Sequence, residues 1–170
     1  VFETVCKDIR RWLDYKMKPV RVSVNFSKQH FKDERFAEHI LDIIHRQGIP
    51  ASYLEIELTE ASGFENFDNF IAFNKIMRDN GIEVSIDDFG TGYSSLNHIR
   101  ELPFDVIKID QSFVKDLEYD NYSRAFIKMV TELADAINVN VCVEGIETQA
   151  QYEVVKELPI TMIQGYYFDK

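Results

Sequence analysis

The sequence is poor in the residues that define several common protein classes. Cysteine occurs at only two of 170 positions, Cys6 and Cys142, which is too few for a disulfide framework and favours reduced, buried thiols. No apolar run is long enough to span a bilayer, and no stretch has the pattern of a signal peptide. Histidine and cysteine show no metal-ligand spacing, which disfavours zinc.

Positive charge is also scarce. The chain has 19 Lys and Arg against 29 Asp and Glu, a net charge of −10. A surface for nucleic-acid polymers is not expected, because polyphosphate binding is driven by Lys and Arg. An acidic protein can still bind a single phosphodiester if metal ions stand between the phosphate and the carboxylates. With 45% hydrophobic residues, the chain is expected to form one globular domain.

The sequence does contain short, β-branched apolar runs that end in polar residues. They predict strands near 21–26, 53–58, 84–88, 106–110, 139–144 and 161–164. Helical spacing predicts helices at the start of the chain and over 29–46, 67–80, 122–137 and 148–158, with a further short helix after Leu96. This alternation is typical of parallel strands, whose C-terminal ends carry the chemistry in β/α folds.

Two architectures fit these strand–helix units, a TIM-like (β/α) barrel and an open doubly wound sheet. An open sheet has helices on both faces and would bury the polar strand residues without partners. In a barrel, alternate residues point inward and converge on one mouth, so the barrel is favoured. A complete barrel needs about 250 residues. Since helical spacing is under way at Val1, residues 1–170 are expected to be a domain incomplete at its N-terminus.

Oxygen donors recur at the predicted strand ends, and they suit Mg²⁺ or Mn²⁺. Carboxylates crowded at one mouth would repel one another strongly without cations. Two ions would activate a water for in-line attack at phosphorus, and Lys108 would balance charge there. The predicted metal ligands are Asn25, Glu57, Asp87, Asp88 and Glu144.

Some assignments stay open. Each of these carboxylates alone is better explained as a solvated charge at a strand end, and only their recurrence favours a metal site. For Glu60 and Glu147, helix capping is an alternative to supporting the metal ligands. Side chains of adjacent strand residues point in opposite directions, so Asp87 or Asp88 must sit at a bend if both reach metal.

Six stretches, in order along the chain, resemble the motifs of the EAL domain family. They are VNFS at 24–27, ELTE at 57–60, DDFGTGYSSL at 87–96, IKID at 107–110, EGIET at 144–148 and QGYYF at 164–168. The family comprises bacterial phosphodiesterases that cut cyclic di-GMP to linear pGpG on a (β/α) barrel. The resemblance therefore implies that activity, with two Mg²⁺ or Mn²⁺ ions.

The resemblance also implies a role for each matching residue. Asn25, Glu57 and Asp87 match metal ligands, with Asp87 bridging and Asp88 serving the second ion. Four further matches imply catalytic roles. Lys108 matches the residue that holds or deprotonates the attacking water, and Glu144 matches one that binds a metal or its water. Gln164 matches a residue that contacts this water network, and Glu60 matches the glutamate that anchors the loop from Phe89 to Ser95.

The Glu-Ala-Leu motif of the first barrel strand is absent from these residues. In the family it supplies another metal ligand, and a nearby arginine contacts the substrate. The resemblance therefore implies an active parent protein, without implying that residues 1–170 are active alone. Residues that bind the substrate are not assigned.

The resemblance further implies cyclic di-GMP as ligand, a homodimer formed through the loop from Phe89 to Ser95, and fused sensory or cyclase domains in the parent protein. Neither binding to a nucleic-acid polymer nor membrane insertion of these residues is expected. The expected location is the bacterial cytoplasm, including as a module of a membrane-anchored sensor. Two other functions stay open: a non-catalytic cyclic di-GMP receptor or interaction module, and a phosphodiesterase for another phosphodiester.

Overall fold

The computed structural model describes residues 1–27, 29–30, 33, 35–59, 67–92 and 102–168. The chain divides into two compact units. The first comprises Val1–Ser85 and Leu102–Phe104, and the second Ile86–Glu101 and Asp105–Lys170. Glu60 and the short helix expected after Leu96 lie outside the described residues.

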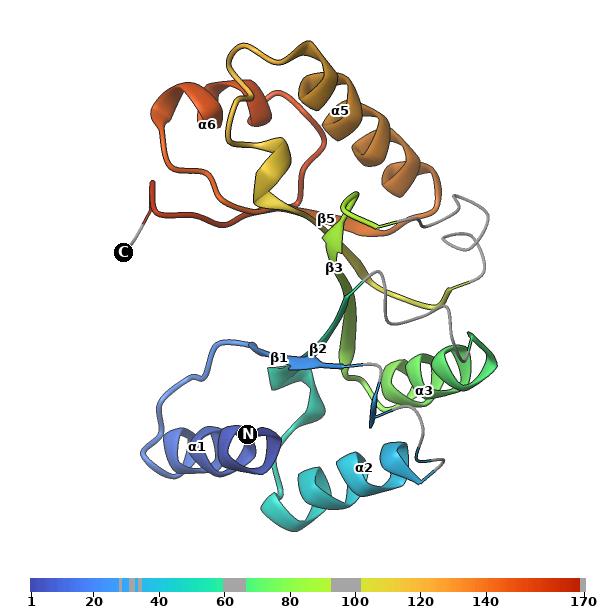
Figure 1. Cartoon of the computed structure of the whole chain (residues 1–170). Coiled ribbons are helices and arrows are strands. Elements are labelled where there is room, and N and C mark those ends of the chain that lie inside the picture. Colours follow the sequence, from blue (N-terminus) through green and yellow to red (C-terminus); the bar gives the residue numbers. More distant parts are fainter. Residues whose placement is uncertain (28, 31–32, 34, 60–66, 93–101, 169–170) are drawn as a thin grey trace. The chain divides into compact units, whose positions relative to one another are not determined.

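The first unit alternates helices and parallel strands. Its elements are α1 (Phe2–Asp14), β1 (Val22–Phe26), α2 (Phe36–Gln47), a 3₁₀ turn (Ala51–Tyr53), β2 (Leu54–Thr59), α3 (Phe67–Asp79) and the first residues of β3 (Glu83–Phe89). β1 pairs with β2 in parallel, in a register that runs from Val22 opposite Leu54 to Phe26 opposite Leu58. In Figure 1, α1, α2 and α3 lie on one side of β1 and β2.

The core of this unit follows from the two-residue repeat of its strands. Leu54, Ile56 and Leu58 of β2 are fully buried. Strand side chains alternate between faces, so the residues between them, Glu55 and Glu57, lie on the other face. One face is therefore apolar and the other polar, as the barrel prediction requires.

Helix α2 begins at Phe36, seven residues later than the predicted start at 29. Side-chain hydrogen bonds around residues 27–35 compete with helical bonding. The Ser27 amide donates to Nδ1 of His30 at 3.1 Å, and the Arg35 amide donates to Oδ1 of Asp33 at 3.0 Å. The predicted helix end is accurate, since Gly48 terminates α2 with a left-handed φ of 60°.

The second unit contains the rest of β3, followed by β4 (Val106–Ile109), the 3₁₀ helix η4 (Gln111–Phe113), α5 (Asn121–Ala136), β5 (Asn140–Val143), α6 (Gln149–Val155) and β6 (Met162–Ile163). β4 pairs with β5, and β5 with β6, all in parallel. In Figure 1, α5 and α6 lie on the same side of β5. The strands follow chain order, β1 to β6, and their bounds agree with the predicted ones to within one residue at each end.

Both cysteines are free and buried, as expected from their scarcity. Burial raises the pKa of the Cys6 thiol to about 11, which keeps it protonated at neutral pH. Among the helices in the described ranges, none has the length and apolar character to cross a membrane.

Helix α5 begins at a cap that depends on pH. Asp120 accepts hydrogen bonds from the Ser123 hydroxyl at 2.6 Å and from the amides of Tyr122 and Ser123 at 3.0 and 3.1 Å. These donors lower the pKa of the Asp120 carboxyl below its ordinary value, the Ser123 hydroxyl most strongly.

We expect this cap to stabilise the fold above the ordinary pKa of aspartate and to be lost as the pH falls through the lowered pKa. Asp120→Asn keeps a good capping residue but removes the titration. Denaturant titrations from neutral pH to about pH 2 should show a smaller loss of unfolding free energy in Asp120→Asn than in the native protein. Parallel losses would contradict the assignment.

Candidate functional site

In the first unit, two predicted ligands are partners across a parallel ladder. Asn25 of β1 lies opposite Glu57 of β2. The Glu57 side chain is buried, whereas Asn25 is exposed. Two residues earlier on the same face, the Ser23 hydroxyl donates to Oε2 of Glu55 at 3.1 Å. Glu55 is as buried as Glu57, and the sequence analysis did not single it out.

In the second unit, Lys108 brings two predicted site residues together. Its ammonium Nζ lies 2.5 Å from Oε1 of Glu144 and 3.9 Å from Oδ1 of Asp87. The Lys108 side chain is 8% exposed, and the two carboxylates are 19% and 15% exposed. A buried ammonium is costly without opposite charge nearby, so these carboxylates compensate Lys108 electrostatically.

The backbone of β3 bends at Asp88, which interrupts the strand alternation that would otherwise point the Asp87 and Asp88 side chains in opposite directions. The φ of Asp88 is 54°, in the left-handed region that aspartate adopts more readily than most residues. The Asp87 carboxylate accepts from the Asp88 amide at 3.0 Å. Thr91 closes the turn by donating its hydroxyl to the Asp88 carbonyl at 2.8 Å. The bend that a metal site with both aspartates would need is therefore at Asp88.

A polar cavity of about 290 Å³ lies in the second unit. Three of its four carboxylates lie at the ends of β3, β4 and β5, the fourth is that of Glu147 shortly before α6, and Gln164 follows β6. The ladders continue to this edge, since the Glu144 amide donates to the Ile109 carbonyl at 3.1 Å and the Gln164 amide to the Val143 carbonyl at 2.9 Å. The lining residues are Asp88, Asp110, Gln111, Glu144, Gly145, Glu147, Gln164, Gly165 and Tyr166.

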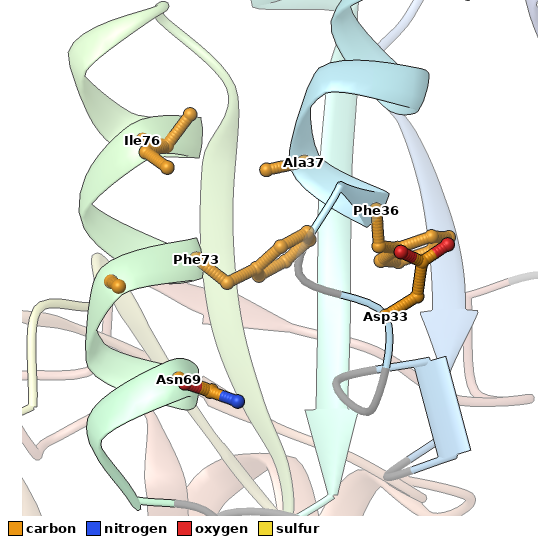
Figure 2. A pocket seen from close by; sticks show the side chains of 7 residues that line it. Asp33, Phe36, Ala37, Asn69, Phe73 and Ile76 are labelled. Atoms are coloured by element: carbon orange, nitrogen blue, oxygen red, sulfur yellow. The ribbon is translucent and has the colours of Figure 1, made fainter.

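The first unit has a different pocket, of about 230 Å³, between α2 and α3. Figure 2 shows Phe36, Ala37, Phe73 and Ile76 along it, with Asp33 and Asn69 as its labelled polar residues. The rings of Phe36 and Phe73 stack with centroids 5.6 Å apart. No predicted site residue lines this pocket, so the polar cavity of the second unit is the better candidate for a functional site.

The chemistry of the predicted ligands suits a hard divalent cation. All are carboxylate or amide oxygens, the donors that Mg²⁺ and Mn²⁺ prefer. Each unit carries its own part of the set, with Asn25 and Glu57 in the first and Asp87, Asp88 and Glu144 in the second. Within the residues that the structure describes, no three side chains of His, Cys, Asp or Glu gather closely enough to form a metal site by themselves.

The EAL domain family matches residues 1–170. The chain belongs to the EAL domain family. This agrees with the resemblance carried by the six motifs.

Curated relatives include two proteins of Pseudomonas aeruginosa. The cyclic di-GMP phosphodiesterase NbdA is 31% identical over 100% of this chain and 22% of its own length. The bifunctional diguanylate cyclase/cyclic di-GMP phosphodiesterase MucR is 31% identical over 98% of this chain and 24% of its own. This EAL domain chain thus spans about a fifth to a quarter of the length of these relatives.

Solved structures give the same fold. The MucR phosphodiesterase in complex with cyclic di-GMP has a TM-score of 0.90 at 30% identity, over 99% of this chain and 68% of that chain. BlrP1 of Klebsiella pneumoniae, solved with manganese and cyclic di-GMP, has a TM-score of 0.84 at 23% identity, over 97% of this chain and 42% of that chain. At that identity the likeness extends to the fold alone. The predicted TIM-like (β/α) arrangement is therefore confirmed.

Sequence reasoning missed some residues that line the cavity of this EAL domain. Gln111 and Tyr166 were given no role, although Gln111 directly follows the motif residue Asp110 and Tyr166 lies within the motif at 164–168. The structure also bears on Glu147. Thr148 and Gln151 form the capping box of α6, and Glu147 lines the cavity. Capping is therefore not the role of Glu147.

Removing the positive charge of Lys108 should destabilise the fold around the Glu144 and Asp87 carboxylates. We expect Lys108→Met to lower the free energy of unfolding by about 3 kcal/mol in metal-free buffer, because the partly buried carboxylates of Glu144 and Asp87 are left uncompensated. Adding Glu144→Gln to this variant should recover part of the loss. Urea denaturation of the single and double variants measures both effects.

Lys128→Met is the matched control, because Lys128 pairs with Glu132 at the surface and is 64% exposed. Its effect should stay within about 0.5 kcal/mol. If Lys108→Met lowered the free energy of unfolding no more than this control does, the Lys108 ammonium would not be the group that compensates the Glu144 and Asp87 carboxylates.

Gly165 should tolerate no side chain. A Cβ there would lie 2.1 Å from the Ile146 carbonyl oxygen and 2.4 Å from the Ile146 nitrogen, both backbone atoms. We expect Gly165→Ala to lower the free energy of unfolding by about 2 kcal/mol or more. It should also speed hydrogen exchange of the Ile146 amide, which donates to the Gln164 carbonyl at 3.1 Å.

Gly48→Ala provides the comparison, because Gly48 has a left-handed φ of 60° but nothing within 4 Å of an added Cβ. That variant should lose only about 1–2 kcal/mol, through backbone strain. Unchanged Ile146 exchange in Gly165→Ala would count against the steric explanation.

Proposed function

We propose that this EAL domain is the catalytic part of a divalent-metal-dependent phosphodiesterase that hydrolyses cyclic di-GMP to linear pGpG. The observation that carries the proposal is the buried Lys108 ammonium, held by the Glu144 and Asp87 carboxylates where oxygen donors line a polar cavity. Hydrolysis of a phosphodiester requires groups that activate a water and groups that stabilise the charge on the phosphate. Carboxylates and an ammonium at one edge of the sheet meet these two requirements.

The proposed metal ligands are Asn25, Glu57, Asp87, Asp88 and Glu144. Their support is the oxygen-only donor set, which suits a hard divalent cation. Bound divalent ions would supply Lewis acidity, which makes a water more acidic and neutralises charge on the phosphate. Two such ions, Mg²⁺ or Mn²⁺, are proposed.

Lys108 is proposed to hold the attacking water or an equatorial phosphate oxygen. Its ammonium has three N–H donors, and the contacts with Glu144 and Asp87 orient it at the strand ends. Glu144 accepts from Lys108, and Gln164, in the same cavity, has an amide that both donates and accepts, as a water network requires. The water oxygen attacks phosphorus, the bond from phosphorus to O3′ breaks, and the leaving oxygen takes a proton.

The choice of cyclic di-GMP rests on the relatives. NbdA and MucR are named as cyclic di-GMP phosphodiesterases, and the MucR structure holds cyclic di-GMP. The carboxylates and Lys108 support cleavage of a phosphodiester but do not select guanine. A dimer through the loop that begins at Phe89, fused sensory or cyclase domains, and a cytoplasmic location remain part of the proposal. MucR, by its name, combines a cyclase with a phosphodiesterase.

The test is hydrolysis of cyclic di-GMP by the full-length protein with Mg²⁺, with Mn²⁺ and with chelator. We expect pGpG to form only with metal. Glu57→Gln should lower kcat on the order of 10²–10³-fold, because several kcal/mol of transition-state stabilisation depend on the ions. Chromatographic separation of pGpG from cyclic di-GMP measures the rate.

Glu55→Gln is the matched control, since Glu55 is equally buried and lies on the same face of β2. It should keep kcat within a few-fold of the native value, because Glu55 pairs with Ser23 and is not a proposed ligand. Tight binding of cyclic di-GMP without turnover would contradict an enzyme and support a receptor. Turnover of other phosphodiesters but not of cyclic di-GMP would contradict the substrate.

A further inference from the structure

Gln151 is 6% exposed, and its side-chain amide bonds to two separate segments of the second unit. Its Oε1 accepts from the amides of Glu147 and Thr148 at 2.8 and 3.0 Å. Its Nε2 donates to the Val114 carbonyl at 3.1 Å and approaches the Lys115 carbonyl at 3.5 Å. Every partner is a backbone group, so the contacts fix chain positions rather than side chains.

The two segments that Gln151 joins both lead from the candidate site. Residues 144–148 connect β5 to α6 and begin with Glu144, whereas residues 110–115 follow β4, which carries Lys108. Nearer the cavity the segments already touch, because a Cβ on Gly145 would lie 2.4 Å from the Cβ of Gln111. The two segments are therefore joined at two places, by close packing of Gly145 on Gln111 near the cavity and by the Gln151 side chain farther from it.

Both segments also form walls of the polar cavity. Asp110 and Gln111 line it from one segment, and Glu144, Gly145 and Glu147 from the other. The 2.5 Å contact between Lys108 and Glu144 spans the same pair of strands. A shift of one segment against the other changes this contact and the width of the cavity together.

We propose that Gln151 is a positioning residue for the hydrolysis: it holds the segment of Glu144 in register with the segment that follows Lys108. The inference rests on the proposed function. The position requires a neutral group with both a donor and an acceptor, because N–H groups lie on one side and carbonyls on the other. Glutamine meets this requirement. Glutamate keeps the acceptor but turns a second acceptor toward the Val114 carbonyl.

Gln151→Glu tests the clamp while keeping half of its hydrogen bonds. In the full-length protein we expect the affinity for Mn²⁺ alone and the kcat for cyclic di-GMP each to fall about 10–100-fold, as for other groups that orient metal ligands. KM should change little, since the clamp acts on the reacting groups. Titration calorimetry with Mn²⁺ and steady-state kinetics give the values.

Gln149→Glu is the control, because Gln149 is exposed and the variant places the same charge in the same turn of α6. It should leave Mn²⁺ affinity and kcat unchanged. A second comparison is Thr148→Ala, which removes a hydroxyl that accepts from the Gln151 backbone amide at 3.1 Å and donates to Oε1 of Glu118 at 3.0 Å. It weakens the helix cap and this contact with Glu118 but leaves the side-chain amide of Gln151 in place. It should lower stability without the loss of kcat.

Gln151→Met, which removes both halves of the clamp, gives a readout independent of catalysis. Hydrogen exchange of the Glu147 and Thr148 amides should be faster in this variant than in the native protein. Native values of Mn²⁺ affinity and kcat in Gln151→Glu, or equal losses in Gln149→Glu, would overturn the positioning role. If the native protein hydrolyses no cyclic di-GMP, the proposed function fails, and Mn²⁺ affinity and exchange still decide whether Gln151 positions this segment.

Discussion

Parallel pairing of the strands is the constraint on which the site depends. In a parallel register, residues that end neighbouring strands lie at the same edge, so a polar residue at each end contributes to one surface. Asn25 opposite Glu57 is one instance. Glu144 and Gln164, whose amides extend the ladders beyond β5 and β6, are another. The opposite faces of these strands are apolar and pack against helices, which leaves the polar face for chemistry.

Carboxylates placed at one edge repel one another, and in the second unit the Lys108 ammonium offsets this repulsion. A buried ion pair adds little to stability, because the cost of removing both charges from water offsets their attraction. Its value here is geometric. The Lys108 ammonium sits within 2.5 Å of Glu144 and 3.9 Å of Asp87, so each carboxylate has a defined position. Divalent ions would therefore bind carboxylate oxygens whose positions the Lys108 contacts have already fixed in part.

The segments after the strands are held with little freedom. Gly145 packs on Gln111, Gly165 packs on the backbone of Ile146, and the Gln151 amide joins two segments from behind the cavity. Each of these contacts forms between stretches distant in sequence. Precision at a catalytic site comes from such supporting contacts as much as from the reacting groups. In this EAL domain, these supporting contacts fix the positions of the segments that follow the strands.

The sequence predicts the strands, most helix bounds and the polar residues at the strand ends, because the repeats of apolar residues are local signals. It placed the start of α2 too early, since the turns near Ser27 and Asp33 depend on hydrogen bonds that periodicity does not encode. It required a bend at Asp87 or Asp88, and only the structure located it at Asp88. Tertiary structure alone decided that Gln111 and Tyr166 line the cavity and that Gln151 clamps it. These roles depend on contacts between segments distant in sequence, which meet only when the chain has folded.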